Sequence, residues 1–126
     1  MSDEYQCLTP EQYEKTREKY REHPHFDLVE ADDHTVLLDL DDGQQPRRRI
    51  RKLVKDLFGL ELEQEWVSKS GNGMHQVWLT HESLDVPTRL AIAAIMSSDP
   101  IRELLALRAH HNGVVEPSML FKPKEQ

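Results

Sequence analysis

Two acidic residues on one predicted strand are the first feature of this sequence with evident chemistry. Asp39 and Asp41 end the aliphatic run 36–41. Alternation along a strand puts both carboxylates on the same face, with Cα atoms roughly 6.5–7 Å apart. That spacing lets them bind one Mg²⁺, or two such ions about 3.5–4 Å apart that also hold water and substrate phosphates. The alternative is a solvated strand end that leads into an acidic turn at Asp42-Gly43.

A polar segment at 68–75, with the sequence Ser-Lys-Ser-Gly-Asn-Gly-Met-His, is the second candidate. Its glycines would let backbone N–H groups converge on an anion, and its hydroxyl and lysine side chains add donors. In this interpretation Lys69, Ser70 and His75 contact a nucleotide phosphate. The alternative is an ordinary hairpin, because Gly-Asn-Gly is a strong turn former and one histidine at a strand start is usually structural.

Charged residues in the last third of the chain supply further candidates. Asp99 is either a third metal-site carboxylate or the N-cap of the helix that Pro100 begins. Arg89 and Arg102 are candidates for phosphate contacts, although exposed helix arginines often contact nothing specific. The basic run 47–52 is open to the same two interpretations.

Length and composition predict one domain, spanning residues 1–126, with a single hydrophobic core. No apolar run approaches the roughly 18–20 residues of a membrane span, and no signal-peptide pattern is present, so we expect a cytoplasmic protein (host cytoplasm if viral) without a membrane partner. One cysteine, Cys7, excludes an internal disulfide and a thiolate-rich zinc site. The net charge of −7 argues against broad, sequence-independent duplex binding.

The elements that must position these residues follow from periodicity and capping signals. We expect helices at 10–21, 46–58, 87–96 and 100–110, and strands at 26–30, 34–41, 60–68, 74–80 and 119–122. Trp66 is in phase with Leu60 and Leu62 and is expected in the core. From residue 34 the order β-α-β-β-α(α)-β predicts an α+β fold: an RRM-like or ferredoxin-like split βαβ sheet with helices on one face, plus an N-terminal helix and an extra strand. The other face is expected to stay open, with Asp39 and Asp41 on it.

Together, three ordered motifs resemble those of the archaeo-eukaryotic primase superfamily, which includes primase-polymerases and the polymerase domains of bacterial end-joining ligases. The motifs are Leu-Leu-Asp39-Leu-Asp41, then Ser70-Gly-Asn-Gly-Met-His75 ahead of a strand, then Ser98-Asp99-Pro100. The likeness covers residues 26–122, the expected catalytic core, and leaves 1–25 as a helical extension. The variant resembles minimal phage or plasmid proteins of this type.

The resemblance implies a metal-dependent nucleotidyltransferase of primase-polymerase type that makes or extends nucleic-acid primers. Its metal, Mg²⁺ or Mn²⁺, would be bound by the catalytic residues Asp39, Asp41 and Asp99. Ser70 and His75 would contact the nucleotide triphosphate, with Lys69 and Arg102 as further nucleotide-binding candidates. The implied partners are nucleoside triphosphates, a single-stranded nucleic-acid template, and a helicase or other replication subunit. The alternative is a non-catalytic RRM-like module that binds nucleic acid, nucleotide or a replication protein.

Overall fold

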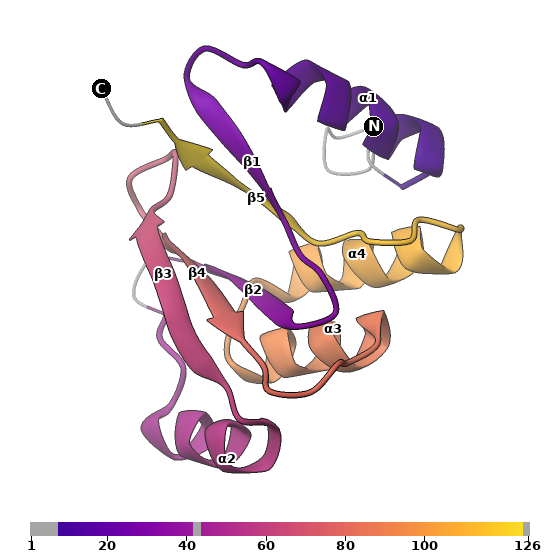
Figure 1. The fold of residues 1–126 in the computed structure, drawn as a ribbon. Helices are drawn as coiled ribbons and strands as arrows, with labels where there is room; N and C mark the ends of the chain where they lie inside the picture. Colours follow the sequence, from indigo (N-terminus) through magenta and orange to yellow (C-terminus); the bar gives the residue numbers. More distant parts are fainter. Residues whose placement is uncertain (1–7, 42–43, 125–126) are drawn as a thin grey trace.

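The structure, a computed structural model, describes residues 8–41 and 44–124, so Cys7 and the expected turn at Asp42-Gly43 lie outside the described residues. The elements follow one another as α1 (Pro10–Arg21), β1 (Phe26–Glu30), β2 (Thr35–Leu40), α2 (Arg48–Phe58), β3 (Glu61–Val67), β4 (Met74–Leu79), α3 (Val86–Ile95), α4 (Pro100–His111) and β5 (Met119–Pro123). Figure 1 shows their arrangement. The predicted α+β class is confirmed.

Within the described ranges, the strands form two antiparallel sheets, one of order β2-β4-β3 and one of order β1-β5. Strand β4 returns between β2 and β3, as the split βαβ arrangement requires. Strand β5 also contacts β2, although its ladder hydrogen bonds go to β1. The strand expected at 26–30, which is β1, therefore pairs with the last strand of the chain.

The larger hydrophobic core lies between the three-stranded sheet and helices α2 and α3. Val36, Leu38 and Leu40 project from β2 into this core, where they meet Val54 of α2 and Met96 after α3. These side chains are almost fully buried, so the period-2 pattern of β2 fixes which face it turns to the helices. Alternation then turns Leu37 and Asp39 to the opposite face.

The opposite face of the sheet is covered over much of its area by the β1–β5 ladder. Leu37 and Val77 are buried there against Val29 and Leu120. The expectation of an open face is therefore wrong for this part of the sheet, because β1 and β5 present apolar side chains that shield it from water. Access remains at the end of β2, beside Asp39.

A β-bulge in β3 decides the orientation of Trp66. The register shifts between Leu62 and Gln64, so Leu62 lies opposite Trp78 while Trp66 lies opposite His75. An extra residue on one strand reverses the face of every later side chain. Trp66 is half-buried and packs on the face of the sheet that carries Leu37 and Asp39. The expectation that Trp66 and Leu62 lie on the same face is therefore wrong.

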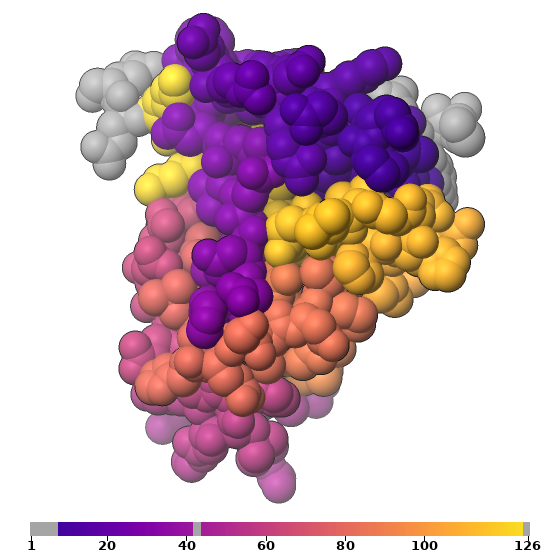
Figure 2. All heavy atoms as spheres, turned by 45° about the vertical axis from the view of Figure 1, so that its right-hand side comes forward, coloured from indigo at the N-terminus to yellow at the C-terminus, as the bar shows by residue number. Residues whose placement is uncertain are grey.

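Helix α1 packs on the outer side of the β1–β5 ladder. A capping box between Thr9 and Gln12 starts the helix. Tyr13 is buried with Ala109 of α4 and with Met119 of β5. Figure 2 shows α1 lying against the C-terminal part of the chain, so the helical extension is packed onto the core of the protein.

Candidate functional site

A cavity of about 270 Å³ brings the first two sequence motifs together. It opens at the end of β2, where the β3–β4 connection returns past the sheet. Its lining residues come from these two segments and are Asp39, Asp41, Ser68, Lys69, Ser70, Asn72, Gly73 and His75. The predicted acids and the predicted polar loop therefore share one cavity.

Asp39 and His75 are direct partners in the β2–β4 ladder. The Nε2 atom of His75 lies 3.3 Å from Oδ1 of Asp39, whose side chain is 28% exposed. The hydrogen bond from His75 lowers the pKa of the Asp39 carboxyl despite partial burial, and the charge of Arg102 adds a smaller effect in the same direction. Asp39 is therefore favoured as a carboxylate facing the cavity.

The His75 ring is buried, with an exposed fraction of 8%. The Trp66 ring meets it edge-on, with centroids 5.6 Å apart. The Nδ1 atom of His75 has no hydrogen-bond partner among the residues that the structure describes. Because Nε2 of His75 faces Asp39, the ring is placed to orient this carboxylate. The expected contact of His75 with a phosphate stays a prediction.

Asp41 lies just after β2 and is exposed at the cavity rim. Its carboxyl pKa is raised by desolvation and then by the negative charges of Asp99 and Asp39. Like charges in one region favour protonation of one member or the arrival of a cation. Two carboxylates on a rim open to water also suit Mg²⁺, which usually keeps several waters and takes one or two protein carboxylates. Asp39 and Asp41 therefore fit a divalent cation.

Asp99 is close enough to Asp41 for its charge to affect that carboxyl, but its own side chain caps helix α4. Its carboxylate accepts a hydrogen bond from the backbone N–H of Ile101 at 3.0 Å and so caps α4. Its backbone N–H donates to the carbonyl of Asp39 at 2.8 Å. Over the described part of the chain, no group of three or more His, Cys, Asp or Glu side chains is arranged to hold a metal ion. The structure thus supports the capping interpretation of Asp99, and its role as a third metal ligand stays a prediction.

Ser98 and Glu103 support the backbone of Asp39. Sequence reasoning placed Ser98 in the third motif without a role of its own and missed Glu103. The Ser98 hydroxyl accepts from the backbone N–H of Asp39 at 2.9 Å and donates to Oε2 of Glu103 at 2.5 Å. Both residues are buried, and burial raises the pKa of the Glu103 carboxyl. A buried carboxylate one turn into a helix resembles a surface acid in sequence, so the pattern gave little signal for this network.

The glycine amides of the 68–73 loop are engaged in hydrogen bonds within the loop. The N–H of Gly71 donates to the Ser68 carbonyl at 2.9 Å, and the N–H of Gly73 donates to Oγ of Ser68 at 3.0 Å. The N–H of Asn72 donates to Oγ of Ser70. The expected convergence of glycine N–H groups on an anion is therefore wrong, because these amides close the turn itself.

The predicted cationic residues differ in how available they are. Lys69 is exposed at the cavity, with its ammonium 5.1 Å from the centre of the Phe26 ring. Arg102 donates to both carboxylate oxygens of Glu103 and to the Met119 carbonyl. Arg89 is buried and pairs with Glu116 at 2.7 Å, contrary to the expectation of an exposed arginine. Lys69 is thus the best placed of these cations to meet a ligand.

Comparison of the chain with protein-family models, curated proteins and solved structures gives no match. The case for a function therefore depends on the geometry of the site and on the motifs in the sequence. Among the described residues, no helix has both the length and the apolar character needed to cross a membrane.

Proposed function

We propose that the protein is a metal-dependent nucleotidyltransferase of primase-polymerase type, which joins nucleoside triphosphates into a primer on a single-stranded template. The observation that carries the proposal is the shared cavity of Asp39, Asp41 and the 68–73 loop. Two carboxylates beside hydroxyl and ammonium donors are the groups that bind a divalent cation together with a triphosphate.

Asp39 and Asp41 would hold Mg²⁺ or Mn²⁺ in this reaction. A bound divalent cation supplies activation of the attacking 3′-hydroxyl and neutralisation of charge on the departing pyrophosphate. His75 keeps the Asp39 carboxylate oriented and ionised through its Nε2 hydrogen bond. Ser98 fixes the backbone of Asp39 from the opposite side. The protein's main contribution is therefore positioning of its carboxylates.

Lys69 and Ser70 would contact the triphosphate of the incoming nucleotide. The ammonium of Lys69 and the hydroxyl of Ser70 line the cavity beside the two acids. A cavity of about 270 Å³ lies just below the roughly 300–1,000 Å³ of typical ligand sites, so it suits the cation and phosphate groups better than a whole nucleotide. Asp99 contributes negative charge near Asp41 in this proposal, and Arg102 supports the fold around the site.

Conservative substitutions of the two acids test the proposal. We expect Asp39→Asn and Asp41→Asn to abolish Mn²⁺- or Mg²⁺-dependent primer synthesis and to weaken Mn²⁺ binding in calorimetric titration. The melting temperature should stay nearly unchanged, because asparagine keeps the shape and the Oδ1 acceptor. Asp56→Asn, on the exposed surface of α2, is the matched control and should keep full activity.

A non-catalytic RRM-like module that binds nucleic acid, nucleotide or a replication protein is the second candidate. It is favoured by the engagement of the Asp99 side chain as a helix cap. If the Asp39→Asn/Asp41→Asn double variant keeps full activity, the catalytic proposal must be abandoned.

A further inference from the structure

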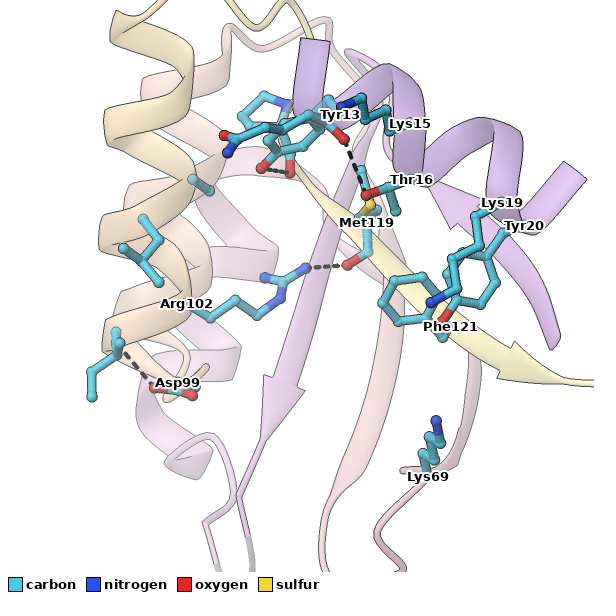
Figure 3. Close-up of a pocket in the computed structure, with 15 residues that line it drawn as sticks. Tyr13, Lys15, Thr16, Lys19, Tyr20, Lys69, Asp99, Arg102, Met119 and Phe121 are labelled. Atoms are coloured by element: carbon cyan, nitrogen blue, oxygen red, sulfur yellow. Dashed lines mark hydrogen bonds between the residues drawn. The ribbon is translucent and has the colours of Figure 1, made fainter. Parts of the chain in front are cut away.

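A groove of about 930 Å³ lies between α1, α4 and β5, outside the cavity described above. Figure 3 shows side chains of α1 and β5 along one side and Asp99 and Arg102 on the other. Lys69 lines both the groove and the Asp39–Asp41 cavity, so the two hollows meet at this residue. A ligand that extends along the groove past Lys69 would therefore approach the candidate site.

The groove is lined by positively charged side chains, although the whole chain carries a net negative charge. The protein carries a net charge of −7, yet the exposed side chains of Lys15, Lys19 and Lys69 line this hollow. Among the described lining residues the acidic one is Asp99, at the far end beside α4. An anionic ligand is therefore favoured here.

Two of these lysines are spaced for an extended anion. Lys15 and Lys19 are four positions apart on α1, so they lie on the same side of the helix about 6 Å apart along its axis. Such a pair can contact successive phosphates of one strand. Because ammonium groups act as point charges, they bind a backbone without reading its sequence.

An aromatic wall, Tyr20 and Phe121, adds a second type of contact. The two rings have centroids 4.5 Å apart and both line the groove. The Lys19 ammonium lies 5.5 Å from the centre of the Tyr20 ring. Aromatic rings beside cations are the combination that binds single-stranded nucleic acid, since bases stack on the rings while the cations hold the phosphates.

We propose that this groove binds a short segment of single-stranded nucleic acid, with its phosphates on Lys15 and Lys19 and its bases against the aromatic wall. The proposal deepens the proposed function and rests on it for the continuation of the strand past Lys69 toward Asp39 and Asp41. An acidic peptide would use the lysines but has no bases to stack on the aromatic wall, so nucleic acid is the better fit.

The test is the binding of a short fluorescein-labelled oligothymidylate to the full chain, followed by fluorescence anisotropy in EDTA without nucleotides. We expect Lys15→Glu/Lys19→Glu to weaken binding by about tenfold or more and to reduce the dependence of log K on log salt by about 1.4, because two phosphate contacts are lost. The matched control is Arg48→Glu/Arg51→Glu on α2, with the same change of charge on exposed residues. It should change affinity by less than about threefold.

A second pair of variants tests the aromatic wall. Tyr20→Phe keeps the ring and should bind like the unmodified protein, whereas Tyr20→Leu should weaken binding by about tenfold because stacking is lost. Circular dichroism of each variant confirms that the fold is retained. Equal weakening by the α2 pair would overturn the groove as the binding site. Displacement of the oligonucleotide by polyglutamate, without an effect of Tyr20→Leu, would overturn nucleic acid in favour of an acidic peptide.

The two proposals fail in different ways in these experiments. Asp39→Asn/Asp41→Asn should not weaken binding in EDTA, since these acids lie outside the groove and their loss removes only negative charge. Normal binding by Lys15→Glu/Lys19→Glu, together with metal-dependent activity that needs Asp39, would sink the groove alone. Activity that survives Asp39→Asn/Asp41→Asn would sink the catalytic proposal and leave the binding result standing.

Discussion

The imidazole of His75 faces the carboxylate of Asp39 across the β2–β4 ladder, with Nε2 lying 3.3 Å from Oδ1. The ladder register fixes this pair, and the Trp66 ring closes the histidine off from the side. A carboxylate held by a buried imidazole is pre-oriented for a ligand, as in metal sites where outer residues orient the ligands themselves. We therefore expect His75 to influence the site through Asp39.

Replacing His75 tests this relationship. We expect His75→Ala to raise the pKa of Asp39, because the hydrogen bond is lost while burial of the carboxyl remains. The folded pKa of Asp39 is lowered in the unmodified protein, so its contribution to stability is present above the unfolded pKa and is lost as pH falls through the folded value. The stability difference between the two proteins should therefore shrink on acidification.

Carbon-13 NMR of the Asp39 carboxyl and urea unfolding over a pH series measure these effects. His111→Ala, an exposed change at the end of α4, is the control and should leave the Asp39 titration unchanged. An unaltered Asp39 pKa in His75→Ala would show that the imidazole does not hold this carboxylate.

Local patterns were sufficient for the parts of the fold that are decided within a few residues. The helices expected at 10–21 and 46–58 are found at Pro10–Arg21 and Arg48–Phe58, because a capping box at Thr9 begins α1 and the left-handed Gly59 ends α2. Alternation in β2 also placed Asp39 on the face away from the helices, because a strand has a fixed period of two.

Contacts between segments far apart in the chain could not be predicted from the sequence. Ser98 and Asp39 are 59 positions apart, and nothing local to either residue encodes their hydrogen bond. The bulge that turns Trp66 toward His75 depends on pairing with β4, so periodicity within β3 alone gave the wrong face. Cover of the sheet by β1 and β5 likewise results from pairing between the two ends of the chain.

The two glycines of the 68–73 loop should respond differently to alanine. A Cβ on Gly73 would lie 2.4 Å from the carbonyl oxygen of Leu40, so Gly73→Ala must displace the end of β2 and should destabilise the fold by about 1–3 kcal/mol. Gly71 has a φ of +81° but open space around it, so Gly71→Ala should cost about 1–2 kcal/mol from backbone strain alone.

Urea unfolding alone would not distinguish displacement of β2 from backbone strain, because both variants lose a similar amount of stability. Mn²⁺ titration separates the two effects. Gly73→Ala should weaken Mn²⁺ binding because the displaced strand carries Asp39 and Asp41, whereas Gly71→Ala should bind Mn²⁺ normally. Equal Mn²⁺ affinity in both variants would contradict close packing of Gly73 as a determinant of the site.

Burial of Glu103 should be visible in the pH dependence of stability. The pKa of Glu103 is raised by desolvation, so the folded protein binds more protons than the unfolded chain between the two pKa values. Stability relative to Glu103→Gln should therefore fall as pH rises from the ordinary glutamate range through the raised pKa. Urea unfolding at several pH values measures the difference, with the exposed Glu82→Gln as control. A difference that grows with pH would contradict the raised pKa.

Asp99 can be separated into a capping role and an electrostatic role. Asn is as good an N-cap as Asp, so Asp99→Asn should keep the stability of the protein, whereas Asp99→Ala should lose about 1 kcal/mol because the Ile101 N–H loses its partner. Both variants remove the charge that helps to raise the pKa of Asp41, so the Asp41 pKa should fall in each.

Urea unfolding, carbon-13 NMR of Asp41 and Mn²⁺ titration together distinguish the two roles. A moderate loss of Mn²⁺ affinity that is equal in Asp99→Asn and Asp99→Ala fits a charge acting from a distance, because both variants lose the charge and differ only in the cap. Loss of all Mn²⁺ binding in Asp99→Asn would instead make Asp99 a direct ligand, since the cap and the fold are intact in that variant. Because the Asp99 carboxylate is engaged with α4, the moderate loss is the expected result.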